Sequence, residues 1–431
     1  MAGLLGTLHH ESSGMSVNQV AISTVNQNIT NMNSPGYTRQ RVEQMAQRPY
    51  SQPGLTSSVV NKGQLGQGVQ VSQITRIRNS FYDYQYRAEV HNYGSLSVKN
   101  EYYSGMESIF NEPSDTSISS SISNLFGVCN EISKDPNSIS GKNMLVENAR
   151  FLAGNLTTAY NKLDNYSETV NKQTEAIVGD INTILGKLTE LDKQIKIVES
   201  TGKNANDLLD SKDLLIDELS SKININNEDV KNALMDGNLE LNELNGVEMS
   251  GELQGTLDVA NKIDSYKASL ETLMNTIANE FNNIYKGHPG APDTKDFFVM
   301  GQDAHGNITM SVNKDFLNNP SSIVMNSGKA NALHALRETK INFNGQNMTI
   351  GNYYNGIIED LGYNVQHTEK QLKNESALLL NIDNARASVS SVNLDEEMVN
   401  LIQYQHAYSA SAKVISTLDA LLDVVINGLI R

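Results

Sequence analysis

The sequence is poor in the residues that build a large compact core. Among its 431 residues there is no tryptophan, aromatic residues make up 6%, and hydrophobic residues make up 39%. That supply is lean for a single globule of this length, and it favours an elongated body with much surface. The length itself suggests about two or three domains.

Cysteine and positive charge are also scarce. Cys129 is the only cysteine, which excludes an intramolecular disulfide and a cysteine-based metal cluster. The 33 Lys and Arg stand against 49 Asp and Glu, and a net charge of −16 argues against nucleic-acid binding. The best apolar run, Leu418 to Ile430, contains Asp419 and Asp423, so we expect no membrane span. The first basic residue is Arg39, and we therefore expect no cleaved secretory signal.

Proline is scarce and unevenly placed. None of the eight prolines precedes Pro35, none lies between residues 137 and 288, and none follows Pro320. Because proline breaks helix interiors, three stretches are free to form long uninterrupted helices.

Both ends of the chain carry apolar residues at the 3.5-residue period of a coiled coil. Near the N-terminus the ladder is Leu4, Leu8, Met15, Ile22, Val25 and Ile29. Near the C-terminus it is Leu394, Met398, Leu401, Tyr408, Ile415, Leu422, Val425 and Leu429. The two ends are thus predicted to pair with each other or with neighbouring subunits. Asn393 with Glu396 three residues later predicts the start of the C-terminal helix.

The middle of the chain continues the same spacing. A ladder from Leu145 to Val198 predicts a helix over about 142–199, roughly 85 Å long. Shorter ladders run over 253–284 and 354–382, and 82–110 is a weaker helical candidate. Segments 37–45, 223–247, 297–312 and 340–350 show β-prone alternation with Gly and Asn turns.

The expected fold is mainly α with a smaller β-rich part. It is an elongated multi-domain rod with paired N- and C-terminal coiled-coil helices, a long helical-bundle body and a small inserted β lobe. Residues 1–34 plus 390–431 would form the terminal domain. The body would comprise 35–222, 253–286 and 345–389, and the β-rich outer domain 223–252 plus 287–344.

No set of residues supports catalysis, a cofactor or a metal. His9, His10 and Glu11 lack the second histidine that a zinc protease helix needs. The run Asp395 to Glu397 lies at a helix start, where carboxylates favour the helix dipole. Cys129 has no identifiable histidine partner, and we expect it to be a small buried hydrophobe. We therefore expect no enzyme.

The segment Asn28 to Tyr37 is the most informative local motif. Pro35 and Gly36 fit the two central positions of a type II turn, so the first helix ends abruptly and an extended segment follows. By local physics alone this is a helix stop followed by a turn.

Together with Thr38–Gln40, this segment (NITNMNSPGYTRQ, residues 28–40) resembles the motif shared by bacterial flagellar axial proteins. Three further segments are similar to the flagellar hook-associated protein 1 family. They are FNEPSD at 110–115, NDLLDSKDLLIDELS at 206–220 and SVNLDEEMVNLIQYQHA at 391–407.

The resemblance implies a structural adaptor at the hook–filament junction, with terminal helices that form the inner layer and pack on neighbouring subunits. Asn31, Pro35, Gly36 and Tyr37 would shape the turn out of that layer. The implied partners are copies of the chain in a ring or helical layer, the hook protein, a second junction protein and through it flagellin, and an export chaperone at the C-terminal helix. The implied location is the extracellular flagellum.

Other functions remain open at this point. A hook or distal-rod subunit would explain the 28–40 motif alone. A cytoplasmic coiled-coil scaffold would explain the ladders. A peptidoglycan hydrolase needed for flagellar growth would require a pair of carboxylates in a cleft, which the sequence does not indicate.

Overall fold

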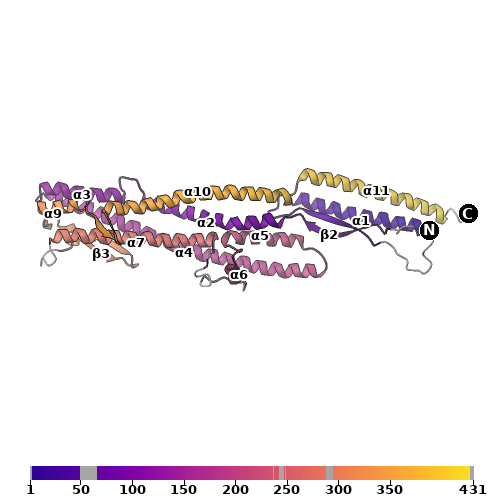
Figure 1. Ribbon diagram of the computed structural model, residues 1–431, viewed down its shortest axis with the longest axis horizontal. Helices are drawn as coiled ribbons and strands as arrows, with labels where there is room; N and C mark the ends of the chain where they lie inside the picture. Colours follow the sequence, from indigo (N-terminus) through magenta and orange to yellow (C-terminus); the bar gives the residue numbers. More distant parts are fainter. Residues whose placement is uncertain are drawn as a thin grey trace.

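The protein is a long rod in which both chain ends lie at one pole (Figure 1). The computed structural model describes residues 2–48, 66–235, 237–241, 247, 249–287 and 295–427. The helices are α1 (Ala2–Thr30), α2 (Ser80–Phe110), α3 (Ile118–Lys134), α4 (Ile139–Ser200), α5 (Asn206–Lys222), α6 (Glu228–Leu234), α7 (Gly251–Lys286), α8 (Lys314–Asn318), α9 (Ser327–Ala335), α10 (Ile350–Ser390) and α11 (Leu394–Asn427), with a short 3-10 turn at Pro320–Ser322.

Three antiparallel hairpins interrupt the helices. They are β1 (Gln40–Ala46) with β2 (Val69–Arg76), β3 (Phe298–Gln302) with β4 (Ile308–Val312), and β5 (Ile341–Phe343) with β6 (Gln346–Met348). The β1–β2 pair carries a bulge between Glu43 and Gln44. Each sheet has two strands, so the fold depends on helix packing, and the prediction of a mainly α rod with a smaller β part is confirmed.

Helix α4 sets the length of the body. Its 62 residues span about 93 Å at 1.5 Å per residue. Ser138 caps its N-terminus by accepting a hydrogen bond from the Gly141 amide, and one stripe of its side chains, from Leu145 to Ile195, is buried. The predicted helix over 142–199 is therefore confirmed, as are those over 82–110, 253–284 and 354–382.

Two hydrophobic clusters stabilise the body. The larger one fills the pole far from the chain ends and joins α3, α4, α7 and the ends of α2 and α10 with the β3–β6 segment. Its centre concentrates the few aromatic residues of the chain, where Phe281, Phe297 and Phe298 pack edge to face or tilted. The buried Asn282 amide hydrogen-bonds the backbone of Phe297 and Phe298 and so joins β3 to α7.

The smaller cluster lies around Ile181 and Leu253 and includes Val230 of α6. The segments 223–252 and 295–344 thus belong to different clusters, and the expected single β-rich lobe built from both is corrected. The described part of 223–247 contains α6 and no strand. Phe297 and Phe298 are buried against α7, which draws the hairpins into the main core.

The segment from Phe110 to Asp115 ties three helices together. Asn111 ends α2 in the left-handed region, and Ser117 caps α3 by accepting from the Ser120 amide. Between them, the Glu112 Oε1 atom accepts hydrogen bonds from the Ser119 amide at 3.1 Å and from the Tyr354 hydroxyl of α10 at 3.0 Å. This short segment therefore fixes the relative positions of α2, α3 and α10.

Candidate assembly surface and polar junction

The two chain ends form an antiparallel helix pair, α1 with α11, which extends beyond the body (Figure 1). A Cβ atom at Gly14 would meet the Ser411 side chain, and Asn28 hydrogen-bonds Glu397, so the start of one helix faces the end of the other. The buried apolar residues of the pair are Val17, Ala21, Val25 and Leu418.

The predicted ladder residues take graded positions on this pair. On α1, Val25 is buried, while Leu4, Leu8, Met15, Ile22 and Ile29 are half-buried. On α11, Leu401, Tyr408, Ile415, Leu422 and Val425 are half-buried, whereas Leu394 and Met398 are exposed. Leu429 lies outside the described residues. The most buried positions of α1 are 17, 21, 24, 25 and 28, of which only Val25 belongs to the predicted ladder.

A second apolar face of α11 is left open. Val399 is 63% exposed, Ile402 49%, Leu421 54% and Val424 65%. Their spacing, extended through Ala410 and Val414, follows one side of the helix. A single chain therefore buries only part of the apolar surface of its terminal helices.

The turn after α1 has the predicted geometry. The Tyr37 amide donates to the Ser34 carbonyl at 3.2 Å, and Gly36 has φ +74°, as the third residue of a type II turn requires. Exposed Pro35 occupies the second position. Asn31 supports the turn because its Oδ1 atom accepts from the Ser34 hydroxyl at 3.2 Å.

Asn28 anchors this turn from inside the helix. Its side chain is fully buried. The Asn28 Nδ2 atom donates to the Gln40 carbonyl at 2.9 Å and to Glu397 Oε2 at 3.0 Å. Its Oδ1 atom accepts from the Gln40 amide at 3.0 Å and from the Tyr37 hydroxyl at 2.9 Å. One amide thus fastens α1 to the turn, to β1 and to α11.

Arg39 completes the connection to α11. Its Nε atom donates to Glu397 Oε1 at 2.8 Å, and its Nη1 atom donates to Glu396 at 2.7 Å. The Arg39 amide donates to the carbonyl of Ser390 at the end of α10. Glu397 is 1% exposed, and its charge is compensated by this pairing. Asn393 caps α11 as predicted, accepting from the Asp395 amide at 3.0 Å.

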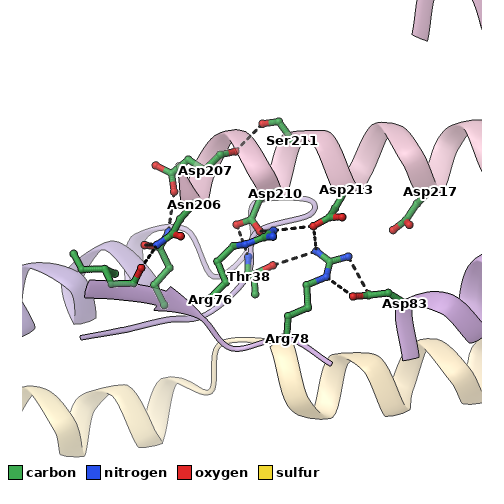
Figure 2. Close-up of polar contacts among 12 residues, drawn as sticks. Thr38, Arg76, Arg78, Asp83, Asn206, Asp207, Asp210, Ser211, Asp213 and Asp217 are labelled. Atoms are coloured by element: carbon green, nitrogen blue, oxygen red, sulfur yellow. Dashed lines mark hydrogen bonds and ion pairs between the residues drawn. The ribbon is translucent and has the colours of Figure 1, made fainter. Parts of the chain in front are cut away.

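A row of carboxylates on α5 meets these elements from the body (Figure 2). Asp210 accepts from the Thr38 amide at 2.9 Å and from Arg76 at 2.8 Å. Asp207 accepts from the Gln40 side chain at 2.8 Å. We use the name polar junction for a set of eight residues: Asn28, Arg39, Gln40, Arg76, Asp207, Asp210, Asp213 and Glu397.

The row continues into an ion-pair network inside the body. Asp213 contacts Arg76, Arg78 and Arg87, at 2.8, 3.1 and 3.0 Å. Burial alone would raise the pKa of Asp213, but the hydrogen bond from Arg76 and the charges of its other partners outweigh it and hold that pKa below its usual value. Asp217 pairs with Arg87 and with Arg386 of α10.

Most of this junction was not predicted as a site. Asn28, Arg39 and Gln40 lie in the 28–40 motif, but the sequence alone predicts no role for them. The α5 carboxylates lie in the 206–220 segment, and they too have no predicted role. The signal was present, because Asp207, Asp210, Asp213 and Asp217 recur at three- and four-residue spacing on one helix face. Their partners lie more than a hundred residues away and carry no local mark.

The remaining chemical candidates stay apart. Cys129 is buried in the main cluster, and burial raises the pKa of its thiol to about 12, so it is poorly reactive at neutral pH. Within the described ranges, no group of three or more His, Cys, Asp or Glu side chains is arranged to hold a metal ion. No helix of that part of the chain is both long and apolar enough to cross a membrane.

Two protein families match parts of the chain, one in the body and one at the C-terminal helix. Residues 103–236 match the family described as flagellar hook-associated protein FlgK helical domain. Residues 386–428 match the family described as flagellar basal body rod FlgEFG protein C-terminal. The second match covers all of α11 and the end of α10, whereas the first covers the body from within α2 through α6.

Curated relatives match over nearly the whole chain. Flagellar hook-associated protein 1 of Bacillus subtilis is 29% identical over 96% of each chain. The protein of the same name from Salmonella typhimurium is 23% identical over 97% of this chain and 99% of the relative. The solved structure of the flagellar hook junction protein FlgK from Burkholderia pseudomallei matches with a TM-score of 0.56 and 14% identity, over 71% of this chain and all of that one, and it supports the fold.

An elongated helical subunit whose two ends pair at one pole, with a C-terminal helix of the basal-body-rod type, defines a bacterial flagellar structural protein. Within that class, the chain is similar over nearly its whole length to proteins named flagellar hook-associated protein 1, and residues 103–236 match the FlgK helical domain.

Proposed function

We propose that this protein is the junction adaptor that polymerises at the hook tip and connects hook to filament. The observation that carries the proposal is the paired terminal helices with an open apolar face on α11, in a chain that matches its relatives from end to end. Such a face has a purpose only when a neighbouring subunit covers it, because isolated apolar stripes of this size favour association.

The charge of α1 supports burial in an assembly. Among its 29 residues Glu11 is the only acidic one, and there is no Lys or Arg. Its outward positions carry small uncharged polar residues such as Ser12, Ser16 and Ser23. Packing such a surface against other subunits avoids the desolvation of charges, which is the main penalty for burying an ordinary helix surface.

The same reasoning assigns roles to the parts of the chain. Residues 1–34 with 390–431 form the assembly domain, and the ladder residues of both helices, with Asn31, Pro35, Gly36 and Tyr37, make or shape its subunit contacts. The body holds these contacts at a fixed distance from the far pole. The interaction is heterologous and repeats in a ring or helical layer.

The proposed partners follow from this position. They are the hook protein on one side, a second junction protein and through it flagellin on the other, and an export chaperone on α11 before assembly. The protein acts outside the cell after passing through the flagellar export channel. Its relatives are structural flagellar proteins, and we propose that this chain too is structural and not an enzyme.

Immunogold labelling of isolated hook–filament complexes tests the proposal. Label confined to one band at the junction supports it, and a strain without the protein is the control. Label along the whole hook would instead indicate a hook subunit. Absence from sheared flagella would indicate a cytoplasmic scaffold.

A further inference from the structure

The boundary between the terminal helix pair and the body has no shared hydrophobic core. All buried members of the two clusters lie between Tyr103 and Leu361, so the described residues of α1, β1, β2 and α11 contribute none. The buried side chains at the boundary are instead polar, as at Asn28, Gln40 and Asp210. The connection between the two parts therefore depends on directed hydrogen bonds.

These hydrogen bonds form two separable sets. One set, around Asn28, Arg39 and Glu397, joins the terminal helices to the extended segment between them. The other set joins that segment and β2 to α5. Asp207 and Asp210 accept from Gln40 and Thr38, and Asp210 and Asp213 accept from Arg76 of β2. The Asn206 side chain donates to the Ile74 carbonyl of β2 at 2.9 Å. Loss of the second set would leave the first intact.

The chain also leaves room for movement at this boundary. A cavity of about 280 Å³ lies beside the turn. It is lined by Gly36 and Thr38, by Leu214 of α5, and by Arg386 and Ser390 of α10, among others. The chain leaves helical structure at 31–39, after α1, and at 391–393, between α10 and α11. These two breaks lie next to each other, and the Arg39 amide donates to the Ser390 carbonyl at 2.9 Å. Two adjacent breaks beside a cavity are the geometry of a hinge.

We propose that the α5 carboxylates Asp207 and Asp210 act as a latch that fixes the angle between the terminal helix pair and the rod. When the latch opens, the terminal pair turns as one unit about the two breaks. Hydrogen bonds suit this task because they fix direction and yet break as a discrete step, whereas apolar contacts slide. The latch is a property of the single chain and does not depend on the proposed function.

Double electron–electron resonance on the full-length protein tests the latch, in a Cys129→Ala background. One label pair, Ser23→Cys with Lys196→Cys, spans the hinge from α1 to α4, and both of these positions are exposed, as is Asp419. The other pair, Ser23→Cys with Asp419→Cys, lies within the terminal helix pair. The test variant is Asp207→Ala with Asp210→Ala. The control is Asp192→Ala, which removes an ion pair between α4 and Lys212 of α5 away from the hinge.

The latch predicts one narrow distance peak for both pairs in the parent protein and in the control. In the test variant, the peak across the hinge is lost while the peak within the terminal pair stays narrow. An unchanged peak across the hinge overturns the proposal. So does the loss of both peaks, since these carboxylates would then hold the terminal pair together. A broad peak across the hinge in the parent protein also overturns it.

Discussion

All four hydrogen-bonding positions of the Asn28 side chain carry a protein partner, two as donors and two as acceptors. A fully buried amide is tolerated only under this condition, because an unsatisfied buried polar group is costly. Each carboxylate oxygen of Glu397 also has a partner, Oε1 in Arg39 and Oε2 in Asn28. The boundary between the terminal helix pair and the body is therefore held in place by buried polar side chains whose hydrogen bonds are satisfied.

Asn28→Ala is expected to weaken the region by roughly 2–3 kcal/mol, because it leaves several buried groups without a partner. Hydrogen exchange of the Gln40 amide measures this locally, since that amide donates to Asn28. Asn26→Ala, at an exposed position of the same helix, is the control. Equal protection of Gln40 in both variants would contradict the expectation.

Asp213 makes stability depend on acid. Its pKa is lower in the folded chain than in the unfolded one, so its stabilising contribution is fully present above the unfolded value of about 3.9. That contribution is lost as pH falls from there through the folded pKa. Thermal unfolding of Asp213→Asn should therefore change less than the parent between neutral and strongly acidic pH. Asp419→Asn, at an exposed position, should follow the parent, and three parallel curves would refute the assignment.

Helix crossings in the body depend on two glycines. An added Cβ at Gly94 of α2 would lie 2.3 Å from the Ser221 carbonyl oxygen of α5, and one at Gly255 of α7 would lie 2.7 Å from the Ser95 carbonyl oxygen of α2. Both contacts are with backbone, which cannot rotate away. At the scale of the element, these glycines set how closely α2 approaches α5 and α7.

Two glycine substitutions should therefore have opposite signs. Gly179→Ala on exposed α4 meets no atom within 4 Å and should stabilise the protein by up to about 1 kcal/mol through helix propensity. Gly255→Ala gains the same helix propensity, but its added Cβ would push α7 away from α2. The net effect should be a loss of folding stability. Chemical unfolding of both variants measures the difference, and stabilisation by Gly255→Ala would show that the crossing has slack.

The whole molecule is a rod with three regions of different physical character. The far pole has an aromatic core, the boundary is polar, and the terminal pair is apolar on faces that a single chain leaves open. This order suits a subunit whose body is rigid and whose ends complete their burial in an assembly.

Assembly should respond to the open face of α11 without any change in the fold. Val399→Ser with Val424→Ser removes two exposed valines, so monomer stability should change by less than about 0.5 kcal/mol. If each valine contributes about 1.5 kcal/mol when buried, the critical concentration should rise about 100-fold. Sedimentation and electron microscopy measure this.

Val299→Ser, on the exposed surface of β3 at the other pole, is the control for that pair. Equal assembly by the double variant and the control would mean that neighbouring subunits do not use this face of α11.

Sequence patterns predicted most of the elements because their causes are local. The ladder in α4, the cap at Asn393, and the Pro35–Gly36 turn each depend on residues a few positions apart. The strand prediction over 223–247 is wrong. Apolar and polar residues alternate there, but the described part of the segment contains helix α6 and no strand.

Periodicity and turn chemistry act within one or two turns of the chain, so the sequence alone predicts the long helices, their ends and the coiled-coil pattern of both termini. It leaves open whether the termini pair with each other or with neighbouring subunits. Only the tertiary structure decided which stripe of α1 is buried, how the β3–β6 hairpins join the main core, and that α5 carboxylates meet Thr38, Gln40 and Arg76. Asn28 and Glu397, like Thr38 and Asp210, lie more than a hundred residues apart, whereas Asn282 and Phe298 are 16 residues apart. In each case the register depends on how closely whole helices pack, which no local pattern encodes.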